Sequence, residues 1–204
     1  MPASRKEMER DRRRELLLAA AERVFGRKPF DEASMQEVAT EAQIGMQGLY
    51  EHFPSKQSLY ESLIFYRIQG FQKRAAETVA GIKDPLGRLR AWALLKAETF
   101  NTAPAFFPVF LTEKVHHDCG FDSRFGPATY ELYGQEQKRL RQLLEGAIKA
   151  GLLKRMDLEF LVQFFFGALE ASLHYHFRRK PGERAETCVD RAMSCFLAGA
   201  GVRP

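Results

Sequence analysis

Three consecutive residues in the first third of the chain, Met46, Gln47 and Gly48, are suited to reading the edges of DNA bases. A glutamine amide can form two hydrogen bonds with adenine, and a methionine thioether can lie against a thymine methyl group. Gly48 has no side chain and leaves room for a close approach of the backbone. Further upstream, Ser34 precedes a helical pattern whose N-terminal N–H groups could bind a phosphate. These residues predict contacts to double-stranded DNA.

Two short helices must hold these side chains in place. The first is predicted over residues 35–42, because apolar residues recur there at the i, i+3, i+4 and i+7 spacing of one helical face. Ser34 is its expected N-cap. Residues 43–45 form a turn, and a second helix then directs Leu49 and Phe53 inward. This is the layout of a helix-turn-helix, whose second helix enters the major groove.

A longer pattern surrounds this motif. An arginine-led helix is expected over 14–25, a short turn over 30–34, and residues 49–56 read Leu-Tyr-Glu-His-Phe-Pro-Ser-Lys. This stretch, from Arg12 to about Ile64, resembles the N-terminal domain of TetR/AcrR-family transcriptional regulators. The remainder of the chain agrees with that family only in its length and helical character.

The resemblance implies an all-α fold, with an N-terminal three-helix helix-turn-helix domain and a C-terminal helical domain for effector binding and dimerisation. We place the first at residues 1–56, with a basic N-terminal arm, and the second at 57–204. Nine or ten helices are expected, the last two pairing with their copies in a homodimer. Tyr50, His52 and Lys56 match family positions that contact DNA phosphates. The alternative for the tyrosine and the histidine is packing between helices.

The helix-turn-helix departs from the family pattern at three positions. Gln43 stands where the family has glycine, and a left-handed backbone there would cost about 1–2 kcal/mol. Gly45 replaces the serine that opens the second helix and is a weaker cap. Met46 replaces a basic residue, which removes one expected contact to DNA. The resemblance therefore leaves the operator sequence open.

The charge distribution favours DNA binding only locally. The chain has 204 residues and a net charge of +5, but residues 1–60 hold ten basic and ten acidic side chains. Basic residues are crowded into the first fourteen positions, where an arm could reach phosphates or the minor groove. The alternative is a solvated, frayed terminus. The basic positions are Arg5, Lys6, Arg10, Arg12, Arg13 and Arg14.

Several other classes of protein are disfavoured. The longest apolar run, near 161–169, is far shorter than the roughly 20 residues that span a bilayer, and no secretory signal is present. We therefore expect a soluble cytoplasmic protein without a membrane partner. Three cysteines, Cys119, Cys188 and Cys195, are too scattered for a disulfide framework. We expect buried free thiols, with a redox switch as the alternative.

Enzyme motifs are also missing from the sequence. It contains no phosphate-binding glycine loop, no GxSxG and no HExxH. One Glu-x-x-His pair, Glu113 and His116, has the spacing of di-iron bundles, but such bundles need a second copy. We therefore predict no catalytic residue, no cofactor and no metal site.

The rest of the chain is predicted to be helical. Phe164–Phe166 would occupy three sides of one helix, so one side needs cover from outside, which a four-helix dimer interface would provide. The alternative is a helix buried inside a monomer. The helices are expected at 56–79, 85–102, 105–117, 128–150, 157–179 and 183–198.

Aromatic side chains are dense in the middle of the chain, beside proline breaks that tend to leave space between helices. They could form an ordinary core, but the family resemblance implies a mostly apolar pocket for a small hydrophobic effector there. The expected pocket residues are Trp92, Phe100, Phe107, Phe110, His116, Phe125, Tyr133 and His174.

The resulting hypothesis is a homodimeric, ligand-responsive transcriptional repressor that a small hydrophobic effector releases from a palindromic DNA operator. One alternative is a helical small-molecule carrier or enzyme whose N-terminal helix pair is incidental. Another is a constitutive DNA-binding protein without an effector.

Overall fold

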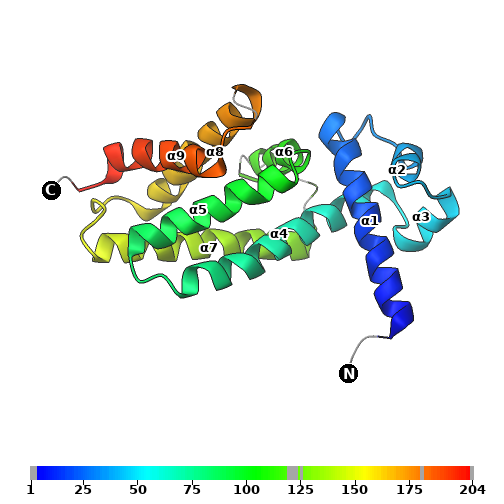
Figure 1. Ribbon diagram of the computed structural model, residues 1–204, viewed down its shortest axis with the longest axis horizontal. Coiled ribbons are helices and arrows are strands. Elements are labelled where there is room, and N and C mark those ends of the chain that lie inside the picture. Colours follow the sequence, from blue (N-terminus) through cyan, green and yellow to red (C-terminus); the bar gives the residue numbers. More distant parts are fainter. Residues whose placement is uncertain (1–3, 119–123, 125, 180–181, 203–204) are drawn as a thin grey trace. The chain divides into compact units, whose positions relative to one another are not determined.

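The computed structural model describes residues 4–118, 124, 126–179 and 182–202, and Figure 1 shows their helices. The described residues form nine helices and no strand, and one isolated antiparallel bridge joins Leu153 to Gly201. The all-α prediction is therefore confirmed. The chain divides into two compact units, described separately below: residues 1–67 with 103–130, and residues 68–102 with 131–204.

The first unit is built around α1. This helix packs against both α2 and α6, and α2 packs against α3. Gly26 is needed where α1 meets the segment before α6, because a Cβ at that position would lie 2.5 Å from the Ala105 Cβ. The helices are α1 (Arg5–Arg27), α2 (Met35–Glu41), α3 (Met46–His52), the start of α4 (Lys56–Ala80) and α6 (Phe106–Asp118).

Two helices of the first unit begin with the same capping arrangement. In α2, the Ser34 hydroxyl accepts a hydrogen bond from the Glu37 N–H at 3.2 Å, and the Glu37 carboxylate accepts one from the Ser34 N–H at 2.9 Å. Ser4 and Glu7 make the same reciprocal pair in α1. Each box satisfies two otherwise free N–H groups. The predicted N-cap role of Ser34 is confirmed.

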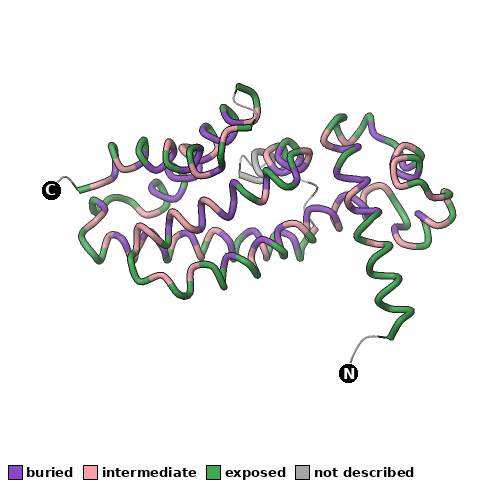
Figure 2. The backbone as a smooth tube through the Cα atoms, viewed as in Figure 1, coloured by how far each residue is buried: buried purple, intermediate pink, exposed green. Residues whose placement is uncertain are grey.

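The basic N-terminal arm predicted from the sequence is part of a helix. Residues 5–13 are exposed and belong to α1, whose first half is exposed along its length in Figure 2. The second half carries a buried apolar face that includes Leu17, Val24 and Phe25. Residues 5–14 therefore form the first part of α1 and not an extended arm, because Ser4 caps the helix just before them.

The second unit contains the remainder of α4 and four further helices, whose bounds lie close to those predicted from the sequence. α9 packs against both α5 and α8. Gly151 ends α7 with a φ of 73°, and an Asp157 carboxylate oxygen accepts from the Phe160 N–H at 2.8 Å to cap α8. The helices are α5 (Pro85–Thr102), α7 (Pro127–Lys149), α8 (Leu158–Arg179) and α9 (Ala185–Ala200).

The thiols on α9 differ from the prediction that both are buried. Cys188 is fully buried, whereas Cys195 is exposed. A spacing of seven residues leaves the two cysteines only about 20° apart around the helix axis. Cys188 is at the edge of the buried face, and Cys195 lies just beyond that edge. The buried stripe instead passes through Ala192 and Phe196. Cys119 lies outside the described residues.

The division into units differs from a boundary at residue 56. The first unit continues into α4 as far as Arg67 and also includes residues 103–130. The reason is the packing of α6 on α1 and a buried hydrogen bond from the Tyr60 hydroxyl to Glu113 at 2.9 Å. Across the described ranges, no helix is long and apolar enough to cross a membrane.

Candidate nucleic-acid interface and interior of the second unit

The exposed side of α3 carries the residues predicted to read DNA. Leu49 and Phe53 are fully buried, as predicted, and anchor the helix through one face. Gln47 is exposed, and Tyr50 has 47% of its surface accessible. Because they are three residues apart, these two side chains lie on neighbouring positions of one face. Met46, Gly48 and His52 are half-buried beside them.

The turn before α3 has the strained geometry that its sequence suggested. Gln43 has a φ of 55°, the left-handed conformation expected to cost a non-glycine residue about 1–2 kcal/mol. The Ile44 N–H donates to the Ala39 carbonyl at 3.0 Å and closes the turn. Gly45 is the N-cap of α3 and provides no side-chain hydrogen bond, as expected.

Gly48 is not required by the fold. A Cβ built there would meet only the Ile44 Cδ1 atom, at an ordinary contact distance of 3.8 Å. A glycine inside a helix costs about 0.5–1 kcal/mol relative to alanine. The described fold therefore gives no reason for a glycine in α3, and the close approach to DNA at Gly48 stays a prediction.

Glu51 is a polar neighbour of Gln47 that the sequence analysis did not consider. The Gln47 side-chain N–H donates to the Glu51 carboxylate at 3.3 Å, one helical turn away. Glu51 is exposed, so it also brings negative charge to the edge of this surface. A base contact by the amide has to replace this long hydrogen bond.

Lys56 has a structural role that sequence reasoning missed. Its ammonium group donates to the backbone carbonyls of Phe30 and Ala33, each at 2.8 Å, and more weakly to that of Asp31 at 3.4 Å. It also lies 4.5 Å from the centre of the Phe30 ring. All three N–H donors have internal acceptors, so Lys56 supports the turn before α2, and the phosphate contact predicted for it stays a prediction.

Arginines of α1 surround His52. A shallow groove is lined by residues including Arg10, Arg13 and His52, which joins the α1 side of this surface to the end of α3. Burial lowers the pKa of His52, and the positive charges of Arg13 and Arg14 lower that pKa further. The imidazole therefore favours its neutral form, and the positive charges of this groove come from Lys6, Arg10 and Arg13, which lie among the carboxylates of Glu7, Glu9 and Glu51.

Arg14 itself is tied into the fold. Its guanidinium donates to the Ser62 hydroxyl at 3.0 Å and lies 4.5 Å from the centre of the Phe53 ring. Of the predicted basic residues, Lys6, Arg10 and Arg13 are exposed cations that line the groove beside His52.

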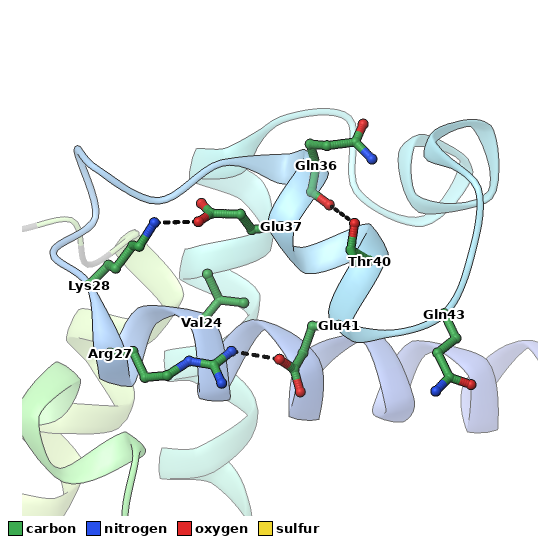
Figure 3. A pocket seen from close by; sticks show the side chains of 8 residues that line it. All are labelled: Val24, Arg27, Lys28, Gln36, Glu37, Thr40, Glu41 and Gln43. Atoms are coloured by element: carbon green, nitrogen blue, oxygen red, sulfur yellow. Dashed lines mark hydrogen bonds and ion pairs between the residues drawn. The ribbon is translucent and has the colours of Figure 1, made fainter.

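The α1–α2 groove in Figure 3 is polar, and its charges are already paired. Lys28 pairs with Glu37, and Arg27 pairs with Glu41 at 2.5 Å. The hydrogen bond from Lys28 lowers the pKa of Glu37 to about 2, with further contributions from Ser34. Any phosphate held at the N-terminus of α2 by Ser34 would share that position with the Glu37 carboxylate.

The residues predicted to line an effector pocket are divided between the units. Trp92, Phe100 and Tyr133 are buried in the second unit, and Phe107 and Phe110 are buried in the first. The His116 side chain and Phe125 lie outside the described residues.

His174 was predicted to line the pocket, but the structure places it on the exposed side of α8. The buried face of that helix is fixed by residues such as Leu169 and Leu173, and it places His176 inward instead. One His176 ring nitrogen lies 3.0 Å from the Asn101 side-chain oxygen. His176, at 4% exposure, is therefore the interior histidine of the second unit.

A buried ion pair in the second unit was not predicted. Lys96 of α5 and Glu136 of α7 are 5% and 2% exposed, and the lysine ammonium donates to a glutamate carboxylate oxygen. Spacing is the sequence signal that could have indicated burial of this pair. Lys96 follows the buried Trp92 by about one helical turn, and Glu136 follows the buried Tyr133 by about one turn. In the described residues, no group of three histidine, cysteine or acidic side chains could hold a metal ion.

The fold and the exposed α3 surface together define a helix-turn-helix DNA-binding protein. Residues 17–63 match the family described as bacterial regulatory proteins, tetR family. The HTH-type transcriptional repressor NicS of Pseudomonas putida is 26% identical over 144 residues, which cover 71% of this chain and 67% of NicS. The nucleoid occlusion factor SlmA of Vibrio cholerae is 24% identical over 165 residues, covering 80% of this chain and 83% of SlmA.

Solved structures share the fold. The ketosteroid transcriptional regulator KstR2 of Mycobacterium tuberculosis superposes with a TM-score of 0.76 at 22% identity, covering 94% of this chain and 96% of that structure. The chain is a DNA-binding transcriptional regulator of the TetR family.

Proposed function

We propose that the protein is a homodimeric repressor that binds a palindromic operator and is released from it by a small hydrophobic effector. The observation that carries this proposal is the exposed pair Gln47 and Tyr50 on a helix-turn-helix whose inner face is fully buried. No catalytic step is part of the function. The protein would act in the cytoplasm, where the operator DNA lies.

The exposed side of α3, with Met46, Gln47, Gly48 and Tyr50, is the proposed reading surface, and it combines base and phosphate contacts. Gln47 and Met46 would contact base edges, and Gly48 would allow the backbone to approach them. Tyr50 would donate its hydroxyl to a phosphate. Arg10 and Arg13 replace Lys56 as the proposed sources of positive charge, since both are exposed and line the groove beside His52.

An exposed aromatic surface on α8 supports the proposed homodimer. Phe160 has 54% of its surface accessible and stacks on Phe164, with ring centres 5.9 Å apart. Phe164 is half-buried against Phe196 of α9, at 5.4 Å, and against Gly199. An exposed phenylalanine continuous with a buried aromatic cluster is favourable to cover with a second copy of the same face.

The effector signal would pass through α4 and α6. α4 continues without a break from residue 56 to residue 80 and so belongs to both units. In the first unit, Glu113 of α6 accepts a hydrogen bond from Tyr60 at 2.9 Å and one from the Arg124 N–H at 2.7 Å. In the proposed homodimer, each subunit presents its α3 to the DNA. A shift of α4 or α6 would move the two α3 helices away from a separation of about 34–36 Å, which is one turn of DNA.

Operator binding is tested by fluorescence anisotropy with DNA from the region upstream of the protein's own gene. Gln47→Ala and Tyr50→Phe should each weaken binding at least tenfold, while the melting temperature stays within a degree or two of the wild type. Tyr66→Phe is the matched control, because Tyr66 is another exposed tyrosine of the first unit, at 39% exposure. Unchanged affinity in both α3 variants would reject this reading surface.

Effector release is tested separately, by screening hydrophobic compounds for loss of operator binding together with a rise in melting temperature. Compounds that stabilise the protein and release DNA support a ligand-responsive repressor. The likeness to SlmA over most of both chains favours a second candidate, a constitutive DNA-binding protein that acts in nucleoid occlusion. Genome-wide mapping of bound DNA distinguishes a single operator from many dispersed sites.

A further inference from the structure

The interior of the second unit contains a buried charge pair surrounded by aromatic rings. The Lys96 ammonium lies 4.5 Å from the centre of the Phe71 ring and 5.8 Å from those of Trp92 and Phe100. Its ionic partner, Glu136, is 2% exposed. Three helices, α4, α5 and α7, contribute these side chains. The side chains around the Lys96–Glu136 pair are therefore aromatic, and the pair forms a polar centre among them.

Two polar atoms at this centre have no hydrogen-bond partner among the described residues. They are the Trp92 indole Nε1, a donor, and the second carboxylate oxygen of Glu136, an acceptor. Trp92 is fully buried, so bulk water does not reach its N–H group. Buried polar groups in folded proteins nearly always have partners. An unpaired donor and an unpaired acceptor next to one ion pair point to a polar group that binds there.

We propose that this centre binds the hydroxyl group of a neutral, otherwise apolar effector. A hydroxyl can donate its hydrogen to the free Glu136 oxygen and accept the Trp92 N–H at the same time. The apolar body of the effector would lie against the surrounding aromatic rings. This inference rests on the proposed function, because it names the chemical class of the effector in that function.

Charge selects among the possible effector classes. A cationic ligand would have to share the aromatic surroundings with Lys96, which already occupies them and would repel it. A carboxylate could accept from Trp92 but would be repelled by Glu136. The Lys96–Glu136 pair carries no net charge, so a neutral ligand leaves it intact. An ether can accept from the indole but cannot donate to the carboxylate.

A matched set of compounds tests this selectivity on the full chain. Octyl, 3-cyclohexylpropyl and 2-naphthylethyl skeletons are each offered as the alcohol, the methyl ether, the amine and the carboxylate. Trp92 is the single tryptophan of the chain, so its emission reports directly on the site. For at least one skeleton, the alcohol should shift this emission, raise the melting temperature, and bind at least tenfold more tightly than its methyl ether.

One substitution isolates the indole N–H. Trp92→Phe keeps an aromatic ring but removes the donor, so the tightest alcohol should fall to the affinity of its methyl ether, measured by calorimetry. Tyr175→Phe, which removes an exposed hydroxyl on α8, should leave alcohol binding unchanged. If Trp92→Phe fails to fold, the wild-type comparison of alcohol with ether decides alone.

The proposal is overturned if an amine or a carboxylate binds as tightly as its alcohol, or if no alcohol binds and the two atoms simply hold a water molecule. Operator affinity of the ligand-free protein, measured in the same preparations, is independent of both results. A protein that binds alcohols but not its upstream DNA would reject the proposed function and retain the alcohol site. A protein that binds DNA and is released only by acids would do the reverse.

Discussion

Lys56 in the first unit and Lys96 in the second lie at the same distance from a phenylalanine ring, 4.5 Å, but their polar partners differ. Lys56 is half-buried, and backbone carbonyls are its acceptors. Lys96 is 5% exposed and pairs with the carboxylate of Glu136. Where water still reaches a cation, carbonyl dipoles suffice; where it does not, the fold supplies an opposite charge.

The comparison also separates two uses of lysine. Lys56 holds the turn before α2 through backbone carbonyls. Lys96 places charge inside an aromatic interior, where its carboxylate partner still has an oxygen free to accept a hydrogen bond. The first is expected to contribute to stability alone, and the second to stability and ligand selection together.

The largest expected effect comes from removing the counter-charge in the second unit. Glu136→Leu leaves Lys96 buried without an anion and should lower the free energy of unfolding by about 3–5 kcal/mol. The double variant Lys96→Met with Glu136→Leu should recover most of that loss, because no buried charge remains. Urea unfolding followed by Trp92 emission measures both. Equal stability of the single and double variants would mean that Lys96 is not held by this charge.

The next effect distinguishes the two roles considered for Lys56. Lys56→Met keeps the stem but leaves part-buried carbonyls without a donor, and should cost about 1–3 kcal/mol. Lys28→Met, which removes an exposed ion pair of the same unit, should cost about 0–1 kcal/mol. The salt dependence of operator binding should match the wild type in the Lys56 variant. A shallower salt dependence with unchanged stability would restore Lys56 as a phosphate contact.

A smaller effect, opposite in sign, is expected at Gly48. Gly48→Ala should stabilise α3 by about 0.5–1 kcal/mol, since nothing obstructs the added methyl group, yet weaken operator binding. Gly70→Ala in α4 is the matched control from a helix interior that is also unobstructed. It should give the same stabilisation with unchanged DNA affinity. If both variants bind DNA like the wild type, α3 does not approach the bases at residue 48.

The smallest effect is a pH dependence from His52. Its pKa is lowered from 6.5, chiefly by burial and then by Arg13 and Arg14, so the folded state prefers the neutral ring. The unfolded chain takes up the proton more readily, and the stability contributed by neutral His52 is complete above pH 6.5 and lost as the pH falls below it. His52→Gln should flatten the melting temperature between pH 7.5 and 5.5. An equal slope in the variant would assign the effect elsewhere.

The helices were predictable from the sequence because their signals are local. Ser34 with the apolar spacing of residues 35–42 defines α2, and Gly151 and Asp157 mark the end of α7 and the start of α8. The buried anchors Leu49 and Phe53 followed from the same periodicity. Each of these features depends on neighbours within about two helical turns.

The roles of individual polar residues were harder to predict from the sequence, because they depend on partners that are distant in the chain. Lys56 finds its acceptors more than twenty residues upstream, and Lys96 finds Glu136 forty residues downstream. His174 and His176 are separated only by which side of α8 faces inward. No local pattern distinguishes such a lysine from one on a solvated surface.

The discontinuity of the first unit constrains how this protein can be recombined with others. A chimera that exchanges residues 1–67 alone transfers Tyr60 without its hydrogen-bond partner Glu113, and Gly26 without the Ala105 that it accommodates. Both exchanged partners would then meet unmatched surfaces. A transplantable DNA-reading module therefore consists of two inserts, residues 1–67 and 103–130, carried together.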